Sequence, residues 1–214
     1  MKIEKDKIER RMMKITVPEI EKRDDMEISG DPEEPPMIIE GYAVIFDQPQ
    51  TYTFGDETYT EIIRRNALDN ADMRRTVLRY NHEDSVFAFA RVKNGSLQMT
   101  IDSYGLKITA ELIDTRTNKD AYKMIKAQLI DEMSFAFTVA ENGDIWTYSD
   151  DFKNVTREIT AIDVVYDVSI VDTGFYENTN VYARAFGGVD ALKEQAEKAK
   201  LELEKARVLA LAKA

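Results

Sequence analysis

The sequence predicts an α+β fold, mainly β, in a domain at residues 37–186, with an N-terminal arm at residues 1–36 and a helical C-terminal tail at residues 187–214. Three observations predict this organisation. Short runs of alternating apolar and polar residues, separated by turn residues, fill most of the domain and are typical of half-buried strands. Residues 118–131 instead carry apolar side chains at helical spacing. After residue 188 the chain lacks glycine and proline, and opposite charges spaced for a helix recur.

The arm contains charges of both signs and a turn-rich stretch at residues 29–36 that is typical of a linker. Within it, residues 15–17 form one candidate edge strand before Pro18. Residues 37–46 then predict a strong strand, in which Gly41 indicates a bulge or a close approach of backbone.

The domain continues as strands with few helices. Residues 60–72 predict a strand that runs into a short helix, and residues 76–80 predict a strand that ends at Asn81-His82. Asn94-Gly95 marks a hairpin turn, and the alternation on either side of residues 102–105 predicts a β-meander. Strands are also expected at residues 133–139 and, as the longest of the chain, at residues 159–171.

Composition excludes several classes of function. The 214 residues carry a formal net charge of -11 without a basic cluster, so a nucleic-acid partner is not expected. No apolar stretch approaches the roughly 20 residues that span a bilayer, so no membrane partner is expected. The chain has no cysteine and one histidine. Thiolate and histidine-rich metal sites are therefore excluded, and we expect neither a metal nor a cofactor.

Two residues are the natural candidates for nucleophilic chemistry. Ser134 lies in a predicted strand, on a face that it shares with the small residues Ala136 and Thr138. A serine hydroxyl is a weak nucleophile and needs an adjacent base. His82 is the only imidazole in the chain, so it is the only side chain suited to that task near neutral pH.

A carboxylate is expected to orient the imidazole, and the long strand supplies two candidates. Asp163 and Asp167 share the less apolar face of that strand, four residues apart, and the pattern does not choose between them. The alternative is that His82 is an incidental surface residue and Ser134 merely small and polar. A chain of this size offers many such pairs, so spacing alone favours the incidental explanation.

Six segments resemble, in the same order, motifs of the prohead (capsid maturation) proteases of tailed phages, a serine protease family related to herpesvirus assemblin. Asn81-His82-Glu83 resembles the family's histidine motif, and Met133-Ser134-Phe135-Ala136-Phe137 resembles its nucleophile motif. Asp167-Val168-Ser169-Ile170-Val171 resembles the block with the acidic residue. The other similar segments are residues 39–46, 61–68 and 95–106.

The resemblance implies a small closed β-barrel surrounded by helices, as in assemblin. It implies that His82 is the general base, Ser134 the nucleophile and Asp167 the acidic third member, with Asp163 as the fallback. The implied enzyme is a serine endopeptidase that cleaves itself and the scaffolding segment of the major capsid protein. It would act in the host cytoplasm, inside the immature capsid, and whether it self-associates is left open.

The chain departs from the family pattern next to the nucleophile, where Glu132 and Ala136 replace glycines. The acidic residue is Asp where Glu is more usual, and no second histidine exists to serve as an assemblin-type third member. A second hypothesis of another class is therefore a catalytically inactive scaffold or assembly protein of the capsid.

Overall fold

The computed structural model describes residues 8–14, 36–171 and 198. The described chain forms two compact units. The first contains residues 8–14, 36–49, 62–145 and 158–171, and the second contains residues 50–61 and 146–157. All residues considered for catalysis lie in the first unit.

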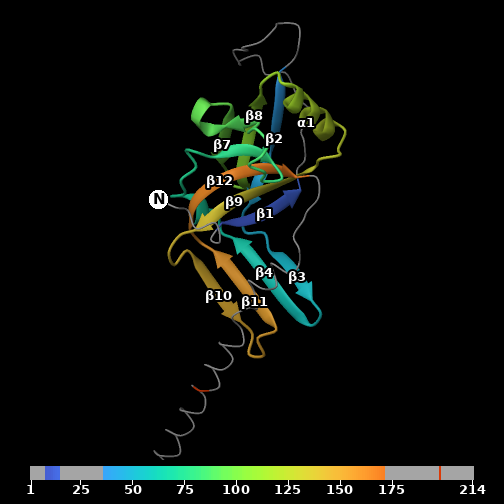
Figure 1. The fold of residues 1–214 in the computed structure, drawn as a ribbon. Helices are drawn as coiled ribbons and strands as arrows, with labels where there is room; N and C mark the ends of the chain where they lie inside the picture. The colour runs from blue at the N-terminus through green and yellow to red at the C-terminus, as the bar shows by residue number, and fades with distance from the viewer. Residues whose placement is uncertain (1–7, 15–35, 172–197, 199–214) are drawn as a thin grey trace, which may run out of the picture. The chain divides into compact units, whose positions relative to one another are not determined.

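A five-stranded sheet carries the candidate site. Its strand order is β1 (Glu9–Lys14), β9 (Glu132–Val139), β12 (Ile162–Val171), β5 (Val77–Tyr80) and β6 (Ala90–Arg91). Strands β12 and β5 are parallel, and the other neighbours are antiparallel. Figure 1 shows β9 lying between β1 and β12. The nucleophile candidate is therefore on an interior strand, which is paired on both edges.

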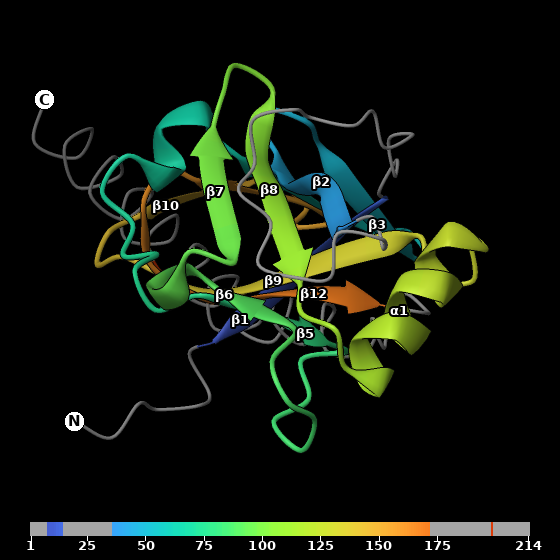
Figure 2. The ribbon, with the colours of Figure 1, turned by 90° about the horizontal axis from the view of Figure 1, so that it is seen from above.

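A three-stranded antiparallel sheet completes the sheets of the first unit. It consists of β2 (Met37–Ile45), β8 (Gly105–Leu112) and β7 (Leu97–Ile101), in that order. A bulge interrupts the β2–β8 ladder at Ala43, two residues after Gly41. The strands of this sheet cross those of the five-stranded sheet steeply (Figures 1 and 2).

The main core lies between these two sheets, because each contributes alternate apolar side chains to it. The three-stranded sheet supplies Ile39, Val44, Leu106 and Ile108 among others, all fully buried. The five-stranded sheet supplies Leu78, Met133, Phe135, Phe137, Val168 and Ile170, also fully buried. The rings of Phe135 and Phe137 stack with centroids 4.5 Å apart. This packing fixes β9 and turns Ser134 to the opposite face.

One α-helix, α1 (Arg116–Lys126), occurs in the described part of the chain. It begins two residues before the predicted start, because the side chain of Thr115 caps it by accepting a hydrogen bond from the Asn118 amide. It ends earlier than predicted, because Gln128 adopts the left-handed conformation with φ 57°.

A four-stranded mixed sheet makes up most of the second unit. It consists of β10 (Asp144–Tyr148), β11 (Asn154–Ile159), β4 (Glu57–Ile63) and β3 (Gln50–Phe54). Strands β3 and β4 are antiparallel, and β4 and β11 are parallel. Tyr59 and Val155 form its buried centre, and further aromatic side chains pack against them. Beside them, Arg157 Nη1 lies 3.3 Å from Glu61 Oε2, and both residues are buried.

The predicted closed barrel surrounded by helices is wrong. The described strands form three separate sheets that do not close, and the described helices other than α1 are two short 3-10 turns, Arg65–Leu68 and Val92–Asn94. Strand β6 has only two residues before the turn at Val92–Asn94, so the chain leaves the first sheet and β7 pairs elsewhere. The barrel came from the family resemblance, and the pairing pattern overturns it.

The terminal segments lie mostly outside the described residues. Residues 9–14 of the arm form β1 and pair with β9, whereas the edge strand predicted at residues 15–17 lies outside the described residues. Of the tail at residues 187–214, only Lys198 is described. No helix in the described segments is long and apolar enough to cross a bilayer.

Candidate active site

Three neighbouring strands bring the candidate residues together. Ser134 on β9 lies directly opposite Ser169 on β12, and Asp167 on β12 lies opposite Ala136. Because side chains alternate along a strand, Ser134, Asp167 and Ser169 project from the same face of the sheet, away from the apolar core. Strand β5, on the other edge of β12, ends at Tyr80 and delivers His82 to this face.

A tight turn after β5 aims the histidine. Asn81 and His82 both adopt positive φ values, 48° and 58°, and the amide of Glu83 donates to the carbonyl of Tyr80 at 2.9 Å. Positive φ at both central residues is the signature of a type I′ turn. Asn and His tolerate this conformation better than most residues, so the sequence permits the turn without glycine.

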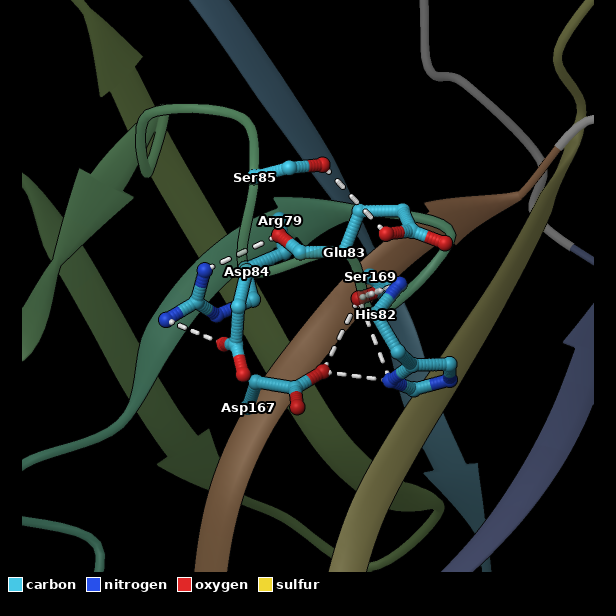
Figure 3. A network of polar contacts seen from close by, with 7 residues as sticks. All are labelled: Arg79, His82, Glu83, Asp84, Ser85, Asp167 and Ser169. Carbon is cyan, nitrogen blue, oxygen red and sulfur yellow. Dashed lines mark hydrogen bonds and ion pairs between the residues drawn. The ribbon is translucent and has the colours of Figure 1, made fainter.

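Arg79 supports the turn from outside. Its Nη1 donates to the carbonyl of Glu83 at 3.0 Å, and its Nη2 lies 3.1 Å from Oδ1 of Asp84. Figure 3 shows the guanidinium reaching along the turn to both groups. The Glu83 carbonyl, which directly follows the histidine, is therefore tied to β5.

The imidazole of His82 lies between the serine and the aspartate. Nε2 is 2.6 Å from Ser134 Oγ, and Nδ1 is 2.6 Å from Asp167 Oδ1. With hydrogen on Nδ1, the ring donates to the carboxylate and leaves Nε2 free to accept from the serine hydroxyl. This is the geometry that a serine nucleophile, a base and an orienting acid require.

The three side chains are largely removed from water. The side chains of His82 and Asp167 are 10% and 11% exposed, and Ser134 is 1% exposed. Low local polarity strengthens the charge-assisted contact between imidazole and carboxylate.

The structure brings Asp167, and not Asp163, to the histidine. Asp163 is exposed, and its carbonyl accepts a hydrogen bond from the amide of Asp72 at 2.8 Å. The β12–β9 ladder has irregularities between Ile162 and Val164 and between Val165 and Asp167. These bulges change which side chains face inward, so the simple alternation expected along residues 159–171 fails here.

Two polar side chains at this site were not predicted from the sequence to act there. Ser169 contacts both His82 and Asp167, and Arg79 holds the turn. The alternation of the strand placed Ser169 on the same face as the aspartates, but nothing in the pattern distinguished it from an ordinary small residue. Arg79 gave no signal, since charged residues are common near strand ends.

The face around Ser134 also contains two buried oxygens that lack hydrogen-bond partners within the described residues. They are Oε2 of Glu132 and Oγ1 of Thr138, which flank Ser134 and Ala136 along β9. An unsatisfied buried oxygen costs about 1–3 kcal/mol, so such groups need a reason to persist.

No group of three or more potential metal ligands occurs in the described segments.

Comparison with known proteins gives one family. A family model described as caudovirus prohead serine protease matches residues 22–194. No curated protein matches the chain. Among solved structures, the chain is similar to the bacteriophage T4 capsid assembly protease, gp21, with a TM-score of 0.43 and 10% identity. That likeness covers 76% of this chain and 98% of the other.

Proposed function

Because this chain belongs to the caudovirus prohead serine protease family, we propose that it is an endopeptidase that uses Ser134, His82 and Asp167 to mature the phage capsid. Its substrates in this proposal are the scaffolding segment of the major capsid protein and the protease chain itself. It acts inside the immature capsid within the host cell. The observation that supports this assignment best is the 2.6 Å contact on each side of the His82 ring.

In the acylation step, Ser134 Oγ attacks the carbonyl carbon of the scissile peptide bond while Nε2 of His82 takes the hydroxyl proton. The imidazolium that forms is stabilised by the Asp167 carboxylate. It then gives its proton to the leaving amine as the carbon–nitrogen bond breaks. The products of this step are an ester on Ser134 and the free amino end of the substrate.

In the deacylation step, a water molecule attacks the ester and His82 again accepts the proton. The carbonyl–Oγ bond breaks, and the imidazolium returns the proton to Ser134. The serine, the histidine and the aspartate therefore end in their starting states. No metal or cofactor takes part in this proposed cycle.

We place the protease domain at residues 37–186, together with β1 from the arm, because β1 pairs with the strand that carries Ser134. Residues 187–214 form a separate tail in this proposal. The alternative is an inactive assembly protein. Such a protein would not need the side chains of Ser134, His82 and Asp167 to meet on one face of the sheet, away from the core.

Co-expression tests the proposal. The capsid protein is produced with the wild-type chain, with Ser134→Ala or with Ser103→Ala, which removes an exposed serine. We expect the wild type and Ser103→Ala to shorten both the capsid protein and themselves, as measured by intact mass. Ser134→Ala is expected to leave both at full length. Full-length proteins in all three cases would support the assembly-protein alternative instead.

A further inference from the structure

Ser169 is the most completely hydrogen-bonded hydroxyl beside the histidine. It is fully buried, and its Oγ lies 3.1 Å from the His82 amide nitrogen, 2.9 Å from Asp167 Oδ1 and 3.3 Å from His82 Nδ1. Figure 3 shows Ser169 contacting both the backbone of His82 and the Asp167 carboxylate. One side chain thus touches two of the three proposed catalytic residues.

The hydrogens at Ser169 can be placed by chemistry. A hydroxyl has one hydrogen to donate and two lone pairs. The carboxylate of Asp167 accepts only, so the hydroxyl hydrogen goes to Oδ1. The lone pairs then face the amide hydrogen of His82 and the Nδ1 atom of its ring. That arrangement is satisfied only when Nδ1 carries the hydrogen.

The hydroxyl therefore disfavours the wrong tautomer. If the hydrogen moved to Nε2, a bare Nδ1 would face a carboxylate oxygen, and Ser169 could donate to Nδ1 only by turning its hydrogen away from Asp167. With hydrogen on Nδ1, Nε2 is the acceptor that Ser134 needs. Asp167 alone favours this state, and Ser169 reinforces it.

The same hydroxyl holds the backbone of the turn. The left-handed conformation is disfavoured for residues other than glycine, and Asn81 and His82 both adopt it. The Asn81 amide is held by the carbonyl of Ile170 at 3.0 Å, and the next amide, that of His82, is held by Ser169 Oγ. Two successive backbone amides are thus bonded to β12, and they fix the position of the His82 backbone from which the imidazole projects.

We propose that Ser169 is a positioning residue that fixes both the Nδ1–H tautomer of His82 and the strained turn that carries it. This inference rests on the proposed protease function, since a positioning role for His82 requires that His82 act. Ser169 does not touch the reacting atoms itself. Its effect is on the rate of the chemical step and not on substrate binding.

The kinetic test compares three variants of the full chain with the wild type. The substrate is a peptide that spans the cleavage site identified from the masses in the co-expression test, called the mapped peptide below. Ser169→Ala removes the hydroxyl. Ser169→Cys fills the space again with a thiol that bonds only weakly. Thr76→Val is the matched control, because Thr76 is also fully buried and its Oγ1 donates to the Val165 carbonyl at 2.7 Å and not to His82. We expect both Ser169 variants to lower kcat by about 10- to 100-fold with little change in KM, and Thr76→Val to leave kcat unchanged.

A spectroscopic test reads the tautomer directly. His82 is the only histidine, so its two ring nitrogens give unambiguous ¹⁵N signals after histidine labelling. The comparison is made in a Ser134→Ala background, which prevents self-cleavage. We expect an Nδ1–H pattern with Ser169 present and a shift toward a mixture of tautomers in Ser169→Ala and Ser169→Cys.

The inference is overturned if the ring-nitrogen pattern does not change in either Ser169 variant, or if Thr76→Val lowers kcat as much as Ser169→Ala. A wild-type chain that cleaves no better than Ser134→Ala refutes the protease function instead. In that case the ring-nitrogen comparison still decides whether Ser169 fixes the imidazole.

Discussion

The acidic partner of His82 gives the sharpest prediction about individual atoms. In Asp167→Asn the side chain keeps its shape but loses its charge. If the new amide turns its NH₂ group toward His82, Nδ1 must accept, and the ring hydrogen moves to Nε2. Nε2 then cannot take the proton from Ser134. If the amide oxygen faces the ring instead, the tautomer survives but the imidazolium loses its counter-charge.

The size of the loss follows from these two effects. Replacing the buried acid of a Ser-His-Asp site by its amide lowers kcat on the order of 10⁴-fold in the best-studied case. The same 2.6 Å contact and an 11% exposed acid predict a loss of roughly 10³- to 10⁴-fold here, about 4–5.5 kcal/mol of transition-state stabilisation. The assay is steady-state cleavage of the mapped peptide by the full chain, which gives kcat and KM separately.

Asp163→Asn is the matched control, because Asp163 lies on the same strand but is exposed, and the His82 ring bonds to Asp167 instead. We expect its kcat to stay within about twofold of wild type. The assignment of Asp167 is refuted if Asp167→Asn retains wild-type kcat, or if Asp163→Asn loses as much activity.

Three further predictions concern stability and the tail. Arg157→Met leaves the buried Glu61 carboxylate without its cation, so the free energy of unfolding in urea should fall by about 3–5 kcal/mol; unchanged stability would show that the pair is not needed. The Tyr42 hydroxyl and nearby amides lower the pKa of Asp102 below its usual value of 3.8, so its stabilising effect is present above that pH and disappears as the pH falls through the lowered pKa. Asp102→Asn should therefore lose less thermal stability than wild type on acidification below pH 3.8, and parallel curves would contradict this. Deletion of residues 189–214 should leave peptide cleavage intact while reducing incorporation into proheads, and loss of cleavage would show that the tail belongs to the catalytic unit.

Much of the first unit could be predicted because its strands alternate cleanly. The meander expected around residues 102–105 is observed as β7 and β8, and the strand expected at residues 133–139 is observed as β9. Membership of the prohead protease family was also predicted, and the family match confirms it. In both cases the signal is local in the sequence. The strands show strict alternation of apolar and polar residues, and the family is indicated by short motifs in the family's order.

What could not be predicted depends on pairing between distant segments. Strand β1 reads Glu-Arg-Arg-Met-Met-Lys, which has no strand-like alternation, and it exists because β9 offers an unpaired edge. The closed barrel, which the family resemblance implied, is wrong because the described strands pair in three separate sheets, and no local pattern states which strands pair. The choice between Asp163 and Asp167 was undecidable by alternation, because the two bulges in β12 that separate them are tertiary features.

In the proposed mechanism, Ser134 becomes covalently acylated by the substrate. Acid quenching of the full chain during cleavage of the mapped peptide, followed by mass spectrometry of the intact protein and its fragments, measures this directly. We expect an adduct of the amino-terminal half of the peptide on Ser134, and neither adduct nor cleavage in Ser134→Ala. Continued cleavage by Ser134→Ala, or an adduct on another residue, would contradict it.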